Sequence, residues 1–593
     1  MLTKKLTALL QNAFEEAGYD KKYGEVVVSG RPDLCQFQCN GAMPAAKEYK
    51  KAPFMISDEV IEKLHANKES KEYISEAVTI RPGFINIKLT DERIAKNVEL
   101  IGNDPRLGVD LTDTPAKIVI DFGGPNIAKP LHVGHLRTAI IGESLKRLLR
   151  FLGNDVIGDI HLGDWGLQMG MVISEIKRMQ PDLPYFDADF VGEYPTTPPF
   201  TLADLDEIYP RVSAKSKEDE TVYEESKEAT FQLQNRNKGY LSLWQHIVDV
   251  SVADIKQNYK RLNVEFDLWY GESHADPYID DAIQILKDKD VLYKSDGALV
   301  VDVARATDKK EIPPIILFKS DGSVIYGTTD LATIYQRVKD FNPDNILYVV
   351  DSRQAGHFTQ VFRCAQDHGI APAELKLEHI GFGTMNGKDG KPFKTRAGGI
   401  LRLEELIQMV EDNAKAKIES NLVEKGIEPL SVDVDEISKI VGLATLKYAD
   451  LSNYRLKDYM FDLDKFSSFE GKTGPYILYS TVRIKNIIRK LEEVNFEKGP
   501  LLPPASQVER DIMLKIDTFG QVLQMAGRDR TPNIICEYVY ELATLVSSFY
   551  HVHHIINEEN IERKKSWYTL LSVTLDVLSK GLDILGIIVP EKM

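Results

Sequence analysis

Two histidines, His132 and His135, enclose a Val-Gly spacer and are the residues of this sequence best suited to chemistry. Their ring nitrogens donate directed hydrogen bonds, and Gly134 between them lacks a side chain, so that a flat ring could approach the backbone closely. A nucleoside triphosphate combines such a ring with phosphate oxygens that accept hydrogen bonds. Ordinary surface or core histidines produce the same short pattern by chance, so the surrounding sequence must decide between the two.

The sequence around the histidines predicts a strand, a loop and a helix. A β-branched run at 118–120 is typical of a buried strand, and apolar residues recur at helical spacing over 136–152 before Gly153 supplies a stop. A second strand is expected at 156–160. The histidines would then lie at a helix N-terminus on the carboxyl edge of a parallel sheet, where unpaired N–H groups and the helix dipole favour a phosphate.

Other polar residues are expected at the same edge of the sheet. Gly163 and Asp164 follow the second strand, and Gln354 lies beyond an apolar strand at 345–351. The alternative for the first pair is a tight glycine-rich turn. We interpret these positions as candidate ligand contacts.

A second wall of the site is expected much later in the chain. The sheet is predicted to resume near residues 315–318, followed by a turn. Tyr326 and Asp330 can face one pocket if a helix begins between them. For Asp330 alone, a surface carboxylate at a helix start is an equal alternative.

A loop at 381–399 is rich in glycine and lysine. It contains three lysines, one arginine and six glycines, a composition typical of a mobile cationic flap. Such a flap can close over a triphosphate and neutralise the charge that develops when pyrophosphate leaves. A solvated turn is the alternative.

The composition indicates a soluble protein of about three or four domains, because the chain has 593 residues, 43% of them hydrophobic and 27% charged. No apolar run reaches membrane-spanning length and the N-terminus does not resemble a signal peptide, so we expect a cytoplasmic protein with no membrane partner. The net charge of −17 argues against indiscriminate nucleic-acid binding, and we expect no DNA partner. A folded RNA held by local basic patches remains compatible with it.

The cysteines predict neither a disulfide framework nor a structural zinc site. They are few and scattered, and no second ligand pair lies near the first two. We interpret all four as packing residues: Cys35, Cys39, Cys364 and Cys536.

The pattern of elements predicts a multidomain α/β protein. We expect an N-terminal α+β domain at 1–113 and a Rossmann-type parallel-sheet catalytic domain at 114–385, interrupted by a mostly helical insertion at about 176–310. A signature loop with a connecting helical region would occupy 386–455. An all-α helix bundle would close the chain at 456–593.

Several stretches in this order resemble arginyl-tRNA synthetases, a family of class I aminoacyl-tRNA synthetases, over almost the whole chain. The similar stretches are 37–43, 82–86, 125–137, 163–166, 266–273 and 586–593. The resemblance implies an arginine–tRNA ligase that uses ATP with Mg²⁺, requires tRNA for the activation step, and acts on L-arginine and tRNA(Arg). We further expect a monomer.

The resemblance also implies roles for individual residues. Catalysis would involve His132, His135, Lys129, Lys391 and Lys394, and ATP would meet His132, Gly134, His135, Gly163, Asp164 and Phe393. Arginine would be bound by Asp121, Asn126, His135, Tyr326, Asp330 and Gln354. The tRNA would contact Phe37, Gln38, Asn40, Tyr476, Tyr479, Arg483 and Met593. A guanidinium carries five donors and suits a fixed carboxylate such as Asp330, which agrees with the second assignment.

One stretch departs from the family pattern. The usual Lys-Met-Ser-Lys-Ser signature is replaced here by Lys391-Pro-Phe-Lys-Thr-Arg396, which allows two registers. One matches Lys391 and Lys394 to the signature lysines, and the other places Phe393 on the methionine. The resemblance to relatives with altered loops implies that Lys129, just before the histidine motif, supplies the missing positive charge.

Two other functions are compatible with parts of this sequence. A related nucleotidylyltransferase could use the same histidine-bearing helix, but it would need neither the N-terminal domain nor the C-terminal bundle. A non-catalytic RNA-binding relative is opposed by the intact His132, His135, Asp330 and Lys394.

Overall fold

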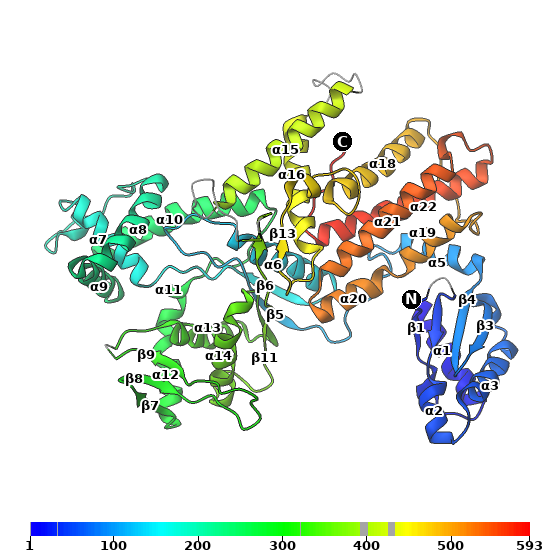
Figure 1. Cartoon of the computed structure of the whole chain (residues 1–593), viewed down its shortest axis with the longest axis horizontal. Helices are drawn as coiled ribbons and strands as arrows, with labels where there is room; N and C mark the ends of the chain where they lie inside the picture. The colour runs from blue at the N-terminus through cyan, green and yellow to red at the C-terminus, as the bar shows by residue number, and fades with distance from the viewer. Residues whose placement is uncertain (1, 32–33, 321, 389, 392–400, 425–432) are drawn as a thin grey trace.

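A central α/β region lies between two lobes and a long helical region, and a small N-terminal domain lies beside that helical region (Figure 1). The structure is a computed structural model that describes residues 2–31, 34–320, 322–388, 390–391, 401–424 and 433–593. Helices predominate in the insertion and in the C-terminal region, whereas the parallel strands lie at the centre. The prediction of a multidomain α/β fold is confirmed.

The central sheet has four strands in the order β11-β10-β5-β6. They are β11 (Lys376–His379), β10 (Asn345–Tyr348), β5 (Lys117–Asp121) and β6 (Asp155–Asp159), and all neighbours are parallel. Helix α6 (Gly134–Phe151) joins β5 to β6 and buries the predicted apolar stripe. The strand–helix–strand unit is therefore confirmed, and the order places β5 and β10 side by side although they are far apart in sequence.

The segment at 315–318 is not part of this sheet, and the prediction that the sheet resumes there is wrong. It forms β9 (Ile315–Phe318), which pairs antiparallel with β8 (Ala298–Val301), itself paired with β7 (Leu292–Ser295). An apolar run shows that a strand is buried but does not reveal its partner. The parallel sheet resumes only at β10.

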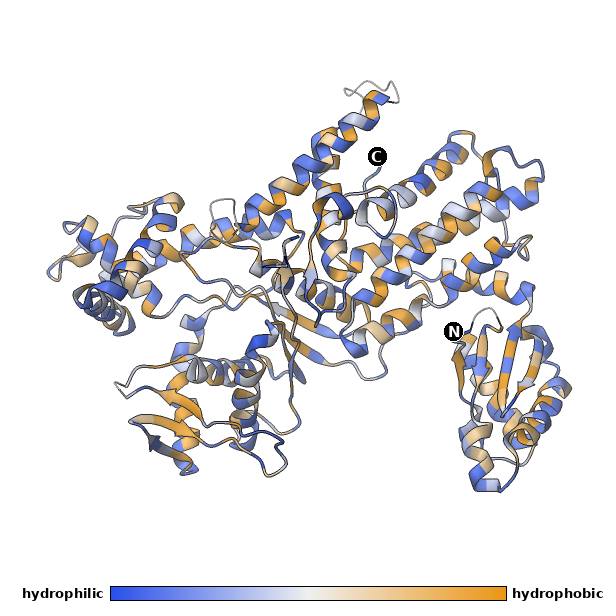
Figure 2. Cartoon of the chain, in the orientation of Figure 1, coloured by the Kyte–Doolittle hydropathy of each residue, from blue (hydrophilic) through white to orange (hydrophobic). Residues whose placement is uncertain are grey.

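The predicted insertion is mostly helical, as expected. It contains α8 (Leu202–Glu218), α9 (Glu220–Gln234) and α10 (Lys238–Arg261), which form a lobe beside the central sheet (Figure 1). In the C-terminal region, α18 (Gly474–Glu493), α21 (Asn533–Val552) and α22 (Ile561–Ile584) pack as a bundle. Hydrophobic and hydrophilic positions alternate along these helices (Figure 2), as expected for helices with one buried face.

The N-terminal domain contains an antiparallel sheet in the order β1-β2-β4-β3. Its strands are β1 (Val26–Val28), β2 (Phe37–Cys39), β4 (Phe84–Leu89) and β3 (Ile74–Ile80). Helices α1 (Leu2–Glu16) and α3 (Pro53–Ala66) pack together and cover this sheet. All four cysteines of the chain are buried and unpaired with one another, which confirms their interpretation as packing residues.

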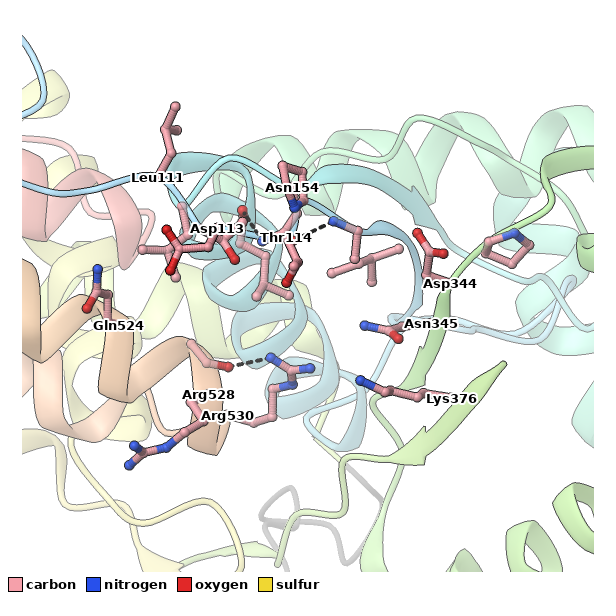
Figure 3. A pocket seen from close by; sticks show the side chains of 18 of the residues that line it. Leu111, Asp113, Thr114, Asn154, Asp344, Asn345, Lys376, Gln524, Arg528 and Arg530 are labelled. Carbon is pink, nitrogen blue, oxygen red and sulfur yellow. Dashed lines mark hydrogen bonds between the residues drawn. The ribbon is translucent and has the colours of Figure 1, made fainter. Parts of the chain in front are cut away.

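An open cavity of about 780 Å³ lies at the amino ends of the parallel strands, opposite the predicted site. Figure 3 shows Leu111 and Asp113 of the linker, Asn345 and Lys376 of the sheet, and Arg530 of the C-terminal region around it. Its charges are of both signs. Among the described residues, no helix is both long and apolar enough to cross a membrane.

Candidate functional site

The two histidines lie at the start of α6, as predicted, and both rings bind the backbone there. The Gly134 N–H donates to Nδ1 of His132 at 3.0 Å, and the His132 N–H donates to Nδ1 of His135 at 3.1 Å. The ring centroids are 4.0 Å apart. Because Nδ1 accepts in each ring, a neutral ring must carry its proton on Nε2. The helix start therefore presents two Nε2–H donors.

Both imidazoles are neutral at physiological pH. Burial lowers the pKa of His135 to about 3, with a further contribution from His132. The pKa of His132 is also lowered, by burial and by the charge of Lys129. This wall of the site therefore offers neutral donors and the positive end of the α6 dipole.

Lys129 and the segment after the glycine-rich loop flank the histidines. Lys129 Nζ lies 4.3 Å from the ring centroid of Tyr209 on α8. The Val133 N–H donates to the Leu401 carbonyl at 3.1 Å, and the Leu403 N–H donates to the Leu131 carbonyl at 2.9 Å. The segment that follows the loop is thus hydrogen-bonded to the histidine segment.

The loop residues with predicted roles are only partly described. Lys391 is described and exposed, whereas Phe393 and Lys394 lie outside the described residues. Arg402, which sequence reasoning missed, is described. Its backbone pairs with His132, and its guanidinium donates to Asp206 of α8 at 2.8 Å.

Gly163 and Asp164 follow β6, but their roles differ. A Cβ on Gly163 would lie 2.3 Å from Oδ1 of Asn126, so a larger residue would displace the Asn126 amide from its present position. The carboxylate of Asp164 is buried and accepts hydrogen bonds from Ser273, from its N–H at 2.9 Å and its hydroxyl at 2.6 Å. Both oxygens of this carboxylate hold the segment at Ser273, and its contact with ATP stays a prediction.

The opposite wall begins with α13 (Tyr326–Phe341). The helix starts at Tyr326 itself, and Asp330 follows one turn later on the same side. The Asp330 carboxylate lies 2.5 Å from Nε2 of His357, and the Tyr326 side chain is 75% exposed. Gln354 is exposed in the short helix after β10. This wall is open to a ligand.

Glu272 is an acidic neighbour that sequence reasoning left without a role. Burial raises the pKa of Glu272, and the negative charge of Asp330 adds to this increase. In turn, burial and the charge of Glu272 raise the pKa of the Tyr326 hydroxyl. The sequence feature that could have identified Glu272 is the Gly-Glu-Ser-His stretch after residues 266–270. Gly271 of this stretch pairs with Leu162 in the loop after β6. This wall therefore attracts cations.

Asp121 ends β5 and is already engaged in an ion pair. Its Oδ2 accepts a hydrogen bond from Arg337 at 2.7 Å, and the same guanidinium nitrogen donates to Asp159 Oδ2 at 2.6 Å. Burial raises the pKa of Asp121, which Arg337 opposes. Asn126 is exposed beside Gly163. One oxygen of Asp121 is therefore bound inside the protein.

Three family models match the chain in succession. They are the arginyl tRNA synthetase N-terminal domain at residues 2–89, the class I (R) tRNA synthetase catalytic domain at 99–463, and the DALR anticodon binding domain at 477–593. An arginine–tRNA ligase of Alkaliphilus oremlandii is 53% identical over the full length of both chains. The chain belongs to the arginyl-tRNA synthetase family. The expected resemblance is confirmed.

Further relatives agree with this assignment to the arginyl-tRNA synthetases. An arginine–tRNA ligase of Agathobacter rectalis is 50% identical over the full length of both chains. The crystal structure of arginyl-tRNA synthetase from Plasmodium falciparum matches with a TM-score of 0.81 at 25% identity, covering 100% of this chain and 99% of that one. The Thermus thermophilus enzyme shares the fold, with a TM-score of 0.79 at 21% identity over the whole of both chains.

The N-terminal residues predicted to meet tRNA do not all face solvent. The side chain of Phe37 is only 2% exposed and packs in the core, so its ring cannot stack on a base. Successive strand residues point to opposite faces, and it is Gln38 that faces outward, where its amide donates to Asn86 at 2.8 Å. Asn40 is exposed. Phe37 is therefore a packing residue, and the tRNA contacts of Gln38 and Asn40 stay predictions.

The C-terminal candidates lie on and near α18. Tyr479 is exposed, and the Arg483 guanidinium lies 5.9 Å from its ring centroid and 4.0 Å from that of Tyr550. Tyr476 is half-buried and its hydroxyl donates to Ser547 at 3.4 Å. Met593 packs against the core cluster. Their contact with tRNA stays a prediction.

Proposed function

We propose that the chain is an arginine–tRNA ligase that converts L-arginine and ATP to arginyl adenylate and pyrophosphate, then transfers arginine to the terminal ribose of tRNA(Arg). The observation that carries the proposal is the pair of walls at one sheet edge. His132 and His135 present neutral donors at the start of α6, and Asp330 presents a carboxylate at the start of α13. The first suits a polyphosphate and the second a guanidinium.

Activation needs no covalent nucleophile from the protein. The arginine carboxylate attacks the α-phosphorus, a bond forms between its oxygen and phosphorus, and the bond to the bridging oxygen breaks with its electrons leaving on pyrophosphate. The Nε2–H groups of His132 and His135 and the N-terminus of α6 stabilise the charge on the phosphate oxygens. Lys129, Lys391 and Lys394 would supply the positive charge.

Arginine would lie between α13 and the end of β5. Tyr326, Asp330 and Gln354 would hold its guanidinium end, while Asp121 and Asn126 would hold its amino-acid end, together with His135. The adenosine would find space beside Gly134 and Gly163, which lack side chains. The ring of Phe393 would cover it. A fixed carboxylate gives the charge-assisted contact that a guanidinium prefers.

Mg²⁺ is expected with the triphosphate. The part of the chain that the structure describes contains no cluster of three His, Cys, Asp or Glu side chains able to hold a metal ion. The phosphates of ATP, rather than a dedicated cluster of protein ligands, would therefore hold Mg²⁺.

The tRNA would extend over both ends of the chain. Gln38 and Asn40 would meet its elbow, and Tyr476, Tyr479, Arg483 and Met593 its anticodon. We further propose that the protein is a cytoplasmic monomer. Its proposed domains are 1–113, 114–385 with an insertion at about 176–310, 386–455 and 456–593. A nucleotidylyltransferase would need neither terminal domain, yet both match their family models.

The test is ATP–pyrophosphate exchange with each amino acid, with and without tRNA(Arg). We expect exchange with arginine alone among the amino acids, and only when tRNA is present. Exchange that no amino acid supports, even with tRNA, would exclude the ligase.

A further inference from the structure

Helix α13 carries a second functional side chain on the face that holds Asp330. Arg337 follows Asp330 by seven residues, which is about two turns and ~10 Å along a helix axis. Residues at this spacing lie on one face of a helix. The acid at the helix start and the arginine two turns later therefore point toward the same sheet.

Arg337 joins the carboxyl ends of three parallel strands. One of its terminal nitrogens donates to Asp121 at the end of β5 and to Asp159 at the end of β6. Its guanidinium carbon lies 5.3 Å from the ring centroid of Tyr348, at the end of β10. The Arg337 side chain is only 2% exposed. This contact fixes α13 relative to the strand ends.

We propose that Arg337 is a positioning residue for substrate arginine: by holding Asp121 at a set distance from Asp330, it determines the length of side chain that the pocket accepts. This inference rests on the proposed function, in which Asp330 binds the guanidinium and Asp121 the amino group. Arg337 binds only Oδ2 of Asp121, and the Asp121 side chain is 10% exposed, so the proposal requires the other oxygen to face the ligand.

The charges explain why an arginine is needed at this position. Asp121 and Asp159 end neighbouring strands, and both accept hydrogen bonds from the same nitrogen of Arg337. Without Arg337, these two buried carboxylates would repel each other. One carboxylate would then bind a proton or turn away. A lysine at 337 would keep the charge, but it lacks the flat guanidinium that lies against the Tyr348 ring, and its shorter side chain would shift the nitrogen relative to the two carboxylates.

The decisive experiment is arginine-dependent exchange by Arg337→Lys in the full chain with tRNA(Arg). We expect the KM for arginine to rise about tenfold or more while the KM for ATP stays within about twofold, because only the arginine pocket is displaced. We also expect the discrimination between arginine and its analogues with one methylene more or fewer to fall about tenfold, within the range one methylene gives.

The matched control is Arg363→Lys on α14 (Ala355–Asp367), where two guanidinium nitrogens bind Asp308 at 2.7 Å each, away from the walls of the site. It should alter neither KM. Should Arg337→Lys fail to fold, Asp159→Asn removes one partner of Arg337 more gently and should still weaken the discrimination between analogues. A lower melting temperature with unchanged KM and unchanged discrimination would show a merely structural role and overturn the proposal. Wild-type protein without arginine-dependent exchange would instead exclude the proposed function.

Discussion

The two walls of the site differ in how they carry charge. At the start of α6, both histidines are neutral, and Nδ1 of each ring accepts a hydrogen bond from a backbone N–H. At the start of α13, Asp330 is joined by the acidic Glu272 and backed by the buried pair of Asp121 and Arg337. One wall works through neutral donors, and the other through fixed carboxylates.

This contrast matches the fates of the two substrates. Arginine keeps its guanidinium throughout both steps, so a permanent carboxylate can hold it. The triphosphate must break and release pyrophosphate, and neutral donors at a helix start stabilise the developing charge without binding the product as a fixed cation would. In the proposed function, positive charge comes from side chains in loops, among them Lys129.

The largest effect that would sharpen the contrast is expected for Asp330→Ala. Removing one partner of a charged contact in a partly buried site should raise the KM for arginine about a hundredfold or more, while the KM for ATP changes less than about threefold. Exchange kinetics with each substrate varied in turn measure both values. Asp340→Ala, on the exposed end of the same helix, is the control. Equal effects on both substrates would contradict the division into two walls.

A smaller effect is expected on the other wall from His135→Asn. Asparagine can keep an acceptor near the Nδ1 position but has no donor near Nε2, so the maximal exchange rate should fall about a hundredfold with little change in the KM for arginine. His135→Gln, which can place an amide donor near Nε2, should retain more activity. The reverse order would show that this ring acts mainly as a cap of α6.

Lys129→Met should have a moderate effect. We expect the exchange rate to fall about tenfold, because the variant removes one charge-assisted contact near the phosphates. Lys129→Arg should recover most of the rate. Tyr209→Phe is the control, since it keeps the ring that Lys129 contacts. A rise in the KM for arginine alone would show that Lys129 acts in the arginine pocket and not near the phosphates.

The smallest effect concerns stability and pH. His135 has a pKa of about 3 in the folded protein against an ordinary value of 6.5, so between these values the unfolded chain binds a proton that the folded chain does not. Folding is therefore disfavoured as pH falls from about 6.5. The apparent melting temperature of His135→Asn should fall less than that of wild type between about pH 7 and pH 5. Identical losses would indicate a protonated imidazole in the fold.

Local sequence predicted the first wall well. The strand, the loop, the glycine and the apolar stripe of α6 all lie within residues 117–151, and backbone propensity and helical period decide such short segments. Asp330 was predicted at a helix start for the same reason. The cluster of three buried charges, Arg337, Asp121 and Asp159, could not be predicted from the sequence, because a sequence pattern does not show which distant carboxylates bind the same nitrogen.

The sequence alone determined the class of fold, the histidine-bearing helix and the family. The tertiary structure decided which side chains remain available to a ligand: Phe37 is turned into the core, Asp164 is bound to Ser273, and residues 315–318 pair outside the parallel sheet. It also joined Arg337 to Asp121 and Asp159, which lie 216 and 178 positions away. Such contacts depend on strand order and on which face of a strand is buried, and these are properties of the packed chain.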